Sequence, residues 1–146
     1  MTLKSSTGLR SALLVTGPLS SILSGGKIKI FGGVVPASAD AGETGTLLST
    51  ITVGSSGTGL HFEATAPDGV LSKASSEVWS GVNSATGVAT HYRFVAAGDT
   101  GALSTTEARL QGSVALIGAD MNLSATLLTS GATQTIDYWV ATLPTP

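Results

Sequence analysis

The chain has 146 residues, of which 42% are hydrophobic and only 11% are charged, with a formal net charge of −2. A domain of this length can bury a core without a metal or a disulfide, and the chain has no cysteine for either. The low charge, less than half of the ~25% usual for globular domains, predicts that a partner covers part of the surface. The few basic residues form no cluster, so we expect no direct contact with nucleic acid.

The sequence also predicts no membrane partner. No apolar segment approaches the ~20 residues needed to span a bilayer. The first residues, Met1 to Ser5, lack the basic and then apolar layout of a signal peptide, so we expect synthesis and use without secretion. The absence of cysteine suits assembly in a reducing cytosol.

Residues 1–26 differ from the rest of the chain because their apolar residues recur at helical spacing. Ser6 or Thr7 can cap a first short helix, and Pro18 can begin a second one that Gly25-Gly26 ends. We interpret this region as an N-terminal helical segment. The alternative is a flexible arm that becomes ordered only on a partner.

From residue 27 onward the apolar residues recur with a period of two, and turn residues interrupt the chain at short intervals. This pattern predicts one β-domain over residues 27–146. The expected strands are residues 27–31, 46–53, 59–65, 76–80, 88–96, 105–114, 122–128 and 134–143. Strands of this number, with connections of unequal length, predict an all-β fold, a jelly-roll-like two-sheet β-sandwich with a short helical N-terminal segment.

Strand alternation assigns side chains to the two faces of each strand. In the strand over residues 88–96, Tyr92 and Phe94 share the face expected in the core, and His91 and Arg93 share the outer face. We expect His91 at the surface or in an interface. The strand over residues 105–114 places polar side chains on its outer face, where we expect water to solvate them: Glu107, Arg109, Gln111 and Ser113.

The two tryptophans, Trp79 and Trp139, allow two interpretations. Exposed aromatic side chains stack on sugar rings in carbohydrate-binding proteins. Aromatic residues make up only 5% of this chain, however, and a small sandwich needs large side chains in its core. We therefore expect both tryptophans in the core or in a subunit interface.

Motifs for catalysis, cofactor binding and metal binding are missing from the sequence. It has no nucleophile elbow, phosphate-binding loop, dinucleotide fingerprint, zinc-protease motif or calcium loop. Its histidines, His61 and His91, lack the convergent partners that catalysis or metal binding requires. Glu63 shares a strand face with His61, and we prefer an ordinary surface pair to a metal site there.

Asp99-Thr100-Gly101-Ala102 resembles the motif that carries the catalytic carboxylate of aspartic proteases, and Ala115-Leu116-Ile117-Gly118 resembles their second signature. The short separation between the two motifs leaves no room for the flap and supporting strands of such an enzyme. Asp99 also follows Ala97-Gly98 rather than an apolar strand that would bury it. We interpret residues 98–101 as a turn and expect no enzymatic activity, catalytic residue, cofactor or metal.

A series of short motifs runs along nearly the whole chain: Ser6-Thr7-Gly8-Leu9-Arg10, Gly25-Gly26-Lys27-Ile28-Lys29-Ile30-Phe31 followed by Pro36 and Ala39-Asp40, Thr58-Gly59-Leu60-His61-Phe62, Ser76-Glu77-Val78-Trp79-Ser80-Gly81, Tyr92-Arg93-Phe94, Asp99-Thr100-Gly101-Ala102-Leu103-Ser104-Thr105 and Gly118-Ala119-Asp120-Met121-Asn122-Leu123. In this order they resemble a family of small virion structural proteins of tailed bacteriophages. The resemblance implies a structural component of the phage particle. It leaves the position on the particle open.

Among virion roles we favour a capsid cement, or decoration, protein made in the host bacterial cytoplasm and bound to the capsid exterior. Its expected partners are the major capsid protein and further copies of itself, as a dimer or trimer. A small protein that bridges a junction between capsomers adds buried area on both sides, and repetition over the lattice multiplies the effect. The alternative is a tail, head-fibre or connector component, with or without a glycan-binding surface.

The residues expected to contact the capsid or another subunit are apolar or aromatic, and they lie in the N-terminal segment, the following loop, the tryptophan positions and the C-terminal tail. They are Leu3, Leu9, Leu13, Leu14, Ile22, Pro36, Trp79, Tyr138, Trp139 and Pro144. For the N-terminal members, the alternative is a helix that closes the end of its own sandwich.

Overall fold

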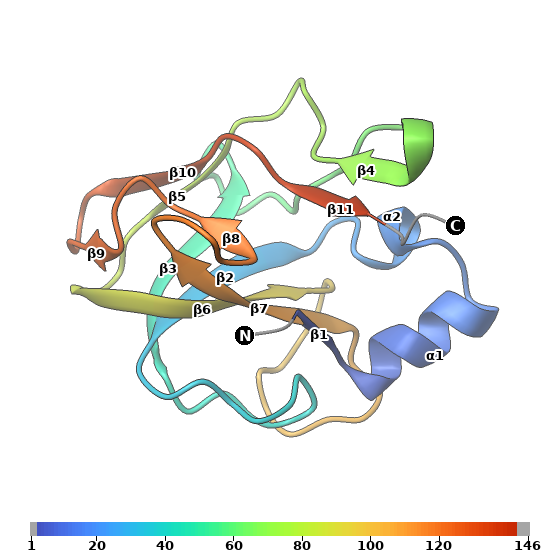
Figure 1. The fold of residues 1–146 in the computed structure, drawn as a ribbon, viewed down its shortest axis with the longest axis horizontal. Helices are drawn as coiled ribbons and strands as arrows, with labels where there is room; N and C mark the ends of the chain where they lie inside the picture. Colours follow the sequence, from blue (N-terminus) through green and yellow to red (C-terminus); the bar gives the residue numbers. More distant parts are fainter. Residues whose placement is uncertain (1–2, 143–146) are drawn as a thin grey trace.

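The structure, a computed structural model, describes residues 3–142. Figure 1 shows the strands in the middle of the molecule and the helices at one end. In chain order the elements are β1 (Lys4–Ser5), α1 (Thr7–Val15), α2 (Leu19–Ile22), β2 (Lys27–Gly32), β3 (Thr46–Val53), the 3-10 turn η1 (Pro67–Gly69), β4 (Val70–Ser72), β5 (Trp79–Val82), β6 (Gly87–Val95), β7 (Arg109–Ala115), β8 (Met121–Asn122), β9 (Leu127–Leu128), β10 (Thr133–Ile136) and β11 (Val140–Thr142).

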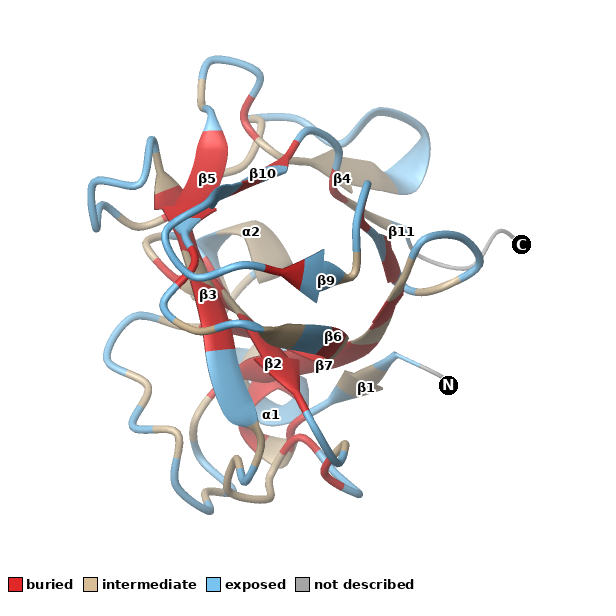
Figure 2. Cartoon of the chain, turned by 90° about the vertical axis from the view of Figure 1, so that its left-hand side faces the viewer, coloured by how far each residue is buried: buried red, intermediate tan, exposed pale blue. Residues whose placement is uncertain are grey.

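The strands form two sheets, one large and one small. The large sheet has the order β1-β7-β6-β2-β3-β5-β10, and each of these pairings is antiparallel. β9 pairs with β6, and β8 lies parallel to β7. The small sheet contains β11 and β4. The expected all-β fold is confirmed, and two sheets around a common interior, as Figure 2 shows, are consistent with a sandwich.

β2, β3 and β6 lie where the alternation of apolar residues predicts strands. Their β-branched and aromatic residues fit a pleated, half-buried surface. β2 pairs with β3 on one side and with β6 on the other, and the register of both pairings shifts next to Phe31. Gly32 follows at this irregularity, and a Cβ there would lie 2.7 Å from the Val88 carbonyl oxygen. The close approach of the two backbones therefore requires glycine.

Other expected strands are shorter or divided. The strand expected over residues 105–114 begins only at Arg109, after a loop that folds back over the sheet. β8 and β9 replace the one strand expected over residues 122–128, which bends interrupt. β10 and β11 replace that expected over residues 134–143, because residues 137–139 between them form no regular structure. β5 begins near the end of its expected range, residues 59–65 make only isolated bridges, and β1 and β4 were not predicted.

The core contains a cluster of aromatic rings contributed by distant parts of the chain. The rings of Phe62, Trp79, Phe94 and Trp139 lie with centroids 5.3 to 6.0 Å apart in every pairing. Trp79 is fully buried and Trp139 is 5% exposed, so the expectation of tryptophans in the core is confirmed. The Trp79 indole nitrogen donates to Glu77 Oε2 at 2.9 Å, which satisfies its polar group.

The N-terminal segment forms the expected short helices and packs onto the sheet. Ser6 caps α1: its hydroxyl accepts from the Leu9 nitrogen at 3.1 Å. The same hydroxyl accepts from the Arg109 nitrogen at 2.9 Å and donates to the Glu107 carbonyl oxygen at 2.8 Å. Leu9 is buried in the core, and a Cβ at Gly8 would lie 2.3 Å from the Thr106 carbonyl oxygen. One buried serine therefore joins the helix to the start of β7.

We expect Ser6→Ala to lower the free energy of unfolding by roughly 2 to 3 kcal/mol, because it removes a helix cap and leaves buried backbone groups without a partner. Urea denaturation measures the change. Ser11→Ala, at an exposed position of α1, is the matched control and should change stability by less than about 0.5 kcal/mol. Equal effects of the two substitutions would contradict the role assigned to the Ser6 hydroxyl.

Candidate functional site

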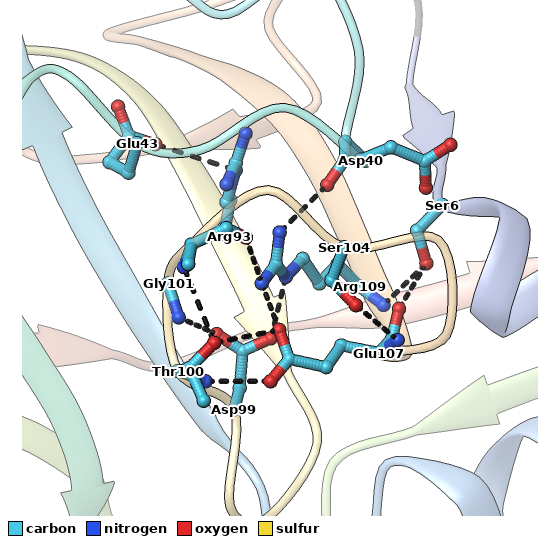
Figure 3. A network of polar contacts seen from close by, with 12 residues as sticks. Ser6, Asp40, Glu43, Arg93, Asp99, Thr100, Gly101, Ser104, Glu107 and Arg109 are labelled. Atoms are coloured by element: carbon cyan, nitrogen blue, oxygen red, sulfur yellow. Dashed lines mark hydrogen bonds and ion pairs between the residues drawn. The ribbon is translucent and has the colours of Figure 1, made fainter.

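Two charged residues on the outer face of the large sheet, Arg93 and Arg109, are buried beneath two loops, residues 33–45 and 96–108 (Figure 3). The sequence predicted water around Arg109 and Gln111, and a surface or interface position for His91. These predictions are wrong: all three side chains are fully buried, and Arg93 is 2% exposed. Alternation identified the outer face of the strands correctly, but the loops exclude water from it. We call these buried polar side chains, His91, Arg93, Arg109 and Gln111, the ionic layer.

Arg109 lies at the centre of the ionic layer. Its Nε donates to Asp99 Oδ2 at 2.6 Å, and its Nη2 is paired with the Glu107 carboxylate. The guanidinium also donates to the carbonyl oxygens of Ala102 at 2.8 Å and Ala39 at 3.4 Å. This side chain therefore joins β7 to both covering loops, and its charge is balanced by two carboxylates.

Arg93, on the neighbouring strand β6, holds the first loop in a similar way. Its Nε donates to Gln111 Oε1 at 2.9 Å and lies 3.4 Å from Glu43 Oε2. Its Nη2 donates to the Ser38 carbonyl oxygen at 3.3 Å. Burial lowers the pKa of Arg93, and the nearby Glu43 carboxylate opposes that shift. A guanidinium titrates so far above neutrality that Arg93 stays charged in the layer.

His91 is a packing residue of the same layer. Its ring stacks on Phe31 with centroids 5.3 Å apart and planes 14° apart. Its Nε2 lies 3.0 Å from Glu43 Oε1, and its Nδ1 lies 2.9 Å from Thr90 Oγ1. Both ring nitrogens thus have partners within the chain, and the ring has no exposed face for a substrate.

The covering loops are also bonded to each other and to α1. The Glu43 nitrogen donates to the Gly101 carbonyl oxygen at 3.1 Å, and the Ser104 nitrogen donates to that of Asp40 at 2.9 Å. The Asp40 carboxylate accepts from the nitrogen and the hydroxyl of Thr7, both at 2.7 Å. These hydrogen bonds from Thr7 lower the pKa of Asp40. A carboxylate at this place also stabilises the first turn of the helix.

Asp99 lies in a turn, as predicted. Its nitrogen donates to the Ala96 carbonyl oxygen at 3.3 Å, and its Oδ1 accepts from the Gly101 nitrogen at 2.8 Å. Gly98 and Gly101 have φ angles of 82° and 78°, which favour glycine. The resemblance of residues 99–102 to a protease motif therefore coincides with a turn whose carboxylate binds Arg109.

The predicted surface pair of His61 and Glu63 does not form, because each side chain has a different partner. His61 Nδ1 lies 2.6 Å from Glu77 Oε1, and Glu63 accepts from the Ser75 nitrogen at 2.6 Å. Within residues 3–142 no group of three or more His, Asp or Glu side chains is arranged to hold a metal. In the same part of the chain no helix is long and apolar enough to cross a membrane.

The predicted contact residues fall into two groups. Leu9, Pro36, Trp79 and Trp139 are buried within the chain and offer almost no surface. Leu14 and Tyr138 are 84% and 76% exposed, and Leu3, Leu13 and Ile22 are partly or largely accessible. Pro144 lies outside the described residues.

Sequence reasoning missed most of the exposed aliphatic side chains. They are Val15, Val34, Val78, Val82, Val88, Leu103, Leu116, Ile117 and Leu127, and each is more than half exposed. Scattered apolar residues are normal on protein surfaces, and here they lie on a chain with little charge. Most of them lie in loops or at the ends of helices and strands, and these positions were the signal in the sequence that could have predicted their exposure.

Comparison with protein-family models, with curated proteins and with solved structures found no match. The functional argument therefore depends on this chain's own geometry and on its motif resemblance.

We expect Arg109→Met to lower the free energy of unfolding by about 3 to 5 kcal/mol, because the buried carboxylate of Asp99 and the half-buried carboxylate of Glu107 would lose their counterion. The matched control is Arg10→Met, which removes an exposed guanidinium and should cost less than about 1 kcal/mol. Urea denaturation measures both. If the two variants were equally stable, the ionic layer would not hold the loops in the way described.

Proposed function

We propose that this protein is a structural virion protein that binds the outer surface of an assembled tailed-bacteriophage capsid and stabilises the junctions between capsomers. The proposed partner is the major capsid protein, and the proposed location is the particle exterior. The ordered motifs described above support a virion role. The observation that carries the cement role is the division of side chains between the interior and the surface.

Charged side chains usually lie at the surface and large aliphatic side chains usually lie inside, and this chain departs from both tendencies. Arg93 and Arg109 lie inside, paired with carboxylates of the loops, while large aliphatic side chains such as Val15 and Ile117 are 87% and 86% exposed. Exposed aliphatic surface favours association with another protein, since burying it removes apolar area from water. A protein that covers junctions needs this property and no reactive group.

The ionic layer also supports this role through rigidity. Binding costs less free energy when the contacting loops are already ordered. Residues 33–45 and 96–108 are fixed by the buried arginines and by hydrogen bonds between the loops. Val34 and Leu103, which are 80% and 76% exposed, project from these fixed loops. The loops can therefore present apolar contacts to a shell with little loss of conformational entropy.

The jelly-roll assignment belongs to the same proposal. Support comes from β2, which lies between β3, its neighbour in the chain, and β6, which follows much later. Greek-key connections, from which jelly rolls are built, produce pairings of this kind between strands far apart in sequence.

The second candidate function is a tail, head-fibre or connector component with a glycan-binding surface. One observation favours it: among the aromatic side chains of residues 3–142, only Tyr138 is exposed, at 76%. It lines a groove of about 320 Å³ together with polar side chains that include Asp120, Asn122 and Asp137. An exposed ring beside carboxylate and amide groups can stack on a sugar and bind its hydroxyls. The buried tryptophans cannot do so.

Particles assembled without this protein should lose DNA at a lower temperature and under milder osmotic shock than complete particles, because junctions between capsomers lose bridging contacts. Released DNA can be followed with an intercalating dye during heating. Addition of the purified protein should restore the resistance, whereas the Arg109→Met variant, whose loops are loosened, should restore less. Unchanged DNA retention in the absence of the protein would contradict the cement role.

Labelling separates the two candidate functions. Gold-labelled antibody should spread evenly over the heads of intact particles if the protein is a cement. Label confined to the tail, or to a single site on the head, would instead support the fibre or connector role. Tyr138→Ala would then be tested for loss of glycan binding.

A further inference from the structure

The outer face of the large sheet has a hollow beside the ionic layer. It has a volume of about 460 Å³ and lies between β2, β3 and the turn over residues 96–99 that follows β6. Lys27 and Lys29 of β2 line it, and both side chains are partly buried. Lys29 lies opposite Thr50 of β3 and Arg93 of β6, so all three side chains are on the same face of the sheet. We call this space the lysine hollow.

The two lysines differ from the other cationic side chains of residues 3–142 because neither has a polar partner there. The chain has seven Lys and Arg residues, and all of them lie in this range. Within it, no hydrogen bond or ion pair joins the ammonium group of Lys27 or Lys29 to another residue. The charges of both lysines are therefore available to a ligand. The other five side chains donate hydrogen bonds to oxygen atoms of this chain: Lys4, Arg10, Lys73, Arg93 and Arg109.

The acidic residue that lines the lysine hollow, Asp99, is already engaged elsewhere. Its Oδ2 accepts from Arg109 Nε at 2.6 Å, and its Oδ1 accepts from the Gly101 nitrogen at 2.8 Å. The Asp99 side chain is 3% exposed. Among the described residues no other Asp or Glu lines the hollow. The hollow therefore contains two ammonium groups and no free carboxylate, an arrangement that attracts anions.

Neutral hydrogen-bond donors accompany the lysines. Thr50, Ala97 and Gly98 also line the hollow. The Thr50 hydroxyl and the backbone nitrogens of Ala97 and Gly98 make no hydrogen bond within the described part of the chain. Gly98 has a φ angle of 82°, and successive amides in turns with such a residue form concave sites for anions. The hollow thus supplies donors of several kinds for one anionic ligand.

We propose that the lysine hollow binds two carboxylates of an extended segment of a partner protein. Alternate residues of a strand are about 6.7 Å apart, so Lys27 and Lys29 match Asp or Glu side chains at alternate positions of another extended segment. Hydrogen bonds between ammonium and carboxylate groups are charge-assisted and strong. This inference rests on the proposed function only for the source of the segment, which is the capsid protein.

Two lysines are too few for the other common anionic surfaces. Binding to nucleic acid neutralises a series of phosphates, and recognition of anionic lipids uses clusters of about four to eight basic residues. A protein segment with two carboxylates requires no more positive charge than the lysine hollow supplies. Complementary charge of this kind contributes specificity, which exposed aliphatic side chains alone do not provide.

Titration of the isotopically labelled protein with a peptide of alternating Glu and Ser residues tests the inference without any capsid. The amide NMR signals of Thr50, Ala97 and Gly98 should shift saturably at peptide concentrations below about 10 mM. A peptide with Gln in place of Glu should cause no such shifts. Lys27→Gln combined with Lys29→Gln should weaken peptide binding by about tenfold or more, because two charge-assisted hydrogen bonds are lost. Circular dichroism confirms that the variant is folded.

Two control variants make the result specific. Lys4→Gln combined with Arg10→Gln removes the same charge from other parts of the surface and should bind the peptide as the wild type does. Lys27→Arg combined with Lys29→Arg keeps the charge and should retain binding. The inference is overturned if the Glu peptide leaves these amide signals unchanged, or if both pairs of Gln substitutions weaken binding equally. Tighter binding of inorganic phosphate than of the peptide at the same amides would also overturn it.

Sedimentation with purified mature shells separates this inference from the proposed function. Lys27→Gln combined with Lys29→Gln should reduce binding to the shells, whereas Lys4→Gln combined with Arg10→Gln should not. If both variants bind as the wild type does, the lysine hollow is not the contact and the cement role still stands. If the wild type does not bind shells, the cement role fails, and the peptide titration still decides whether the hollow binds carboxylates.

Discussion

The pairing of Arg109 with the carboxylates of Asp99 and Glu107 is the interaction on which the rest of this structure depends. The guanidinium lies on β7 under two loops, and the backbone of the same residue bonds to Ser6 at the start of α1. Helix, sheet and loops therefore meet at one buried charge. A buried ion pair contributes little net stability compared with apolar packing, but removal of one partner is costly, so it fixes one arrangement of the loops.

The core could be predicted from the sequence because burial on one side of a strand imposes strict alternation. Phe94 and Tyr92 lie in the core as predicted, and β2, β3 and β6 lie within a residue or so of their expected ranges. The tryptophans lie in the core, one of the two places expected for them, because a small core with few aromatic residues must use the large ones it has.

The ionic layer could not be predicted by the same reasoning. Alternation separates two faces of a strand, but it does not reveal whether loops cover the polar face. Arg109 was therefore expected in contact with water, and Arg93 was placed only on the outer face of its strand. Acidic residues in both loops, including Glu43 and Asp99, were the signal in the sequence, because each is a counterion for a strand arginine. Their pairing depends on loop paths that no local pattern specifies.

The proposed function uses surface area rather than chemistry. Arg93 and Arg109 are held in internal contacts, the covering loops are fixed, and aliphatic side chains project at several places on the surface. In the proposed role the protein would bind an assembled lattice better than an isolated subunit, because only the lattice brings two neighbouring capsomers within reach of one small protein. Mass action then stabilises the assembled state.

Binding of the purified protein to purified capsid components tests this central claim most directly. Sedimentation of mature shells with increasing amounts of the protein should show saturable binding, and the same protein should show far weaker binding to unassembled capsid protein. Equal affinity for both forms, or no affinity for the shells, would contradict the account.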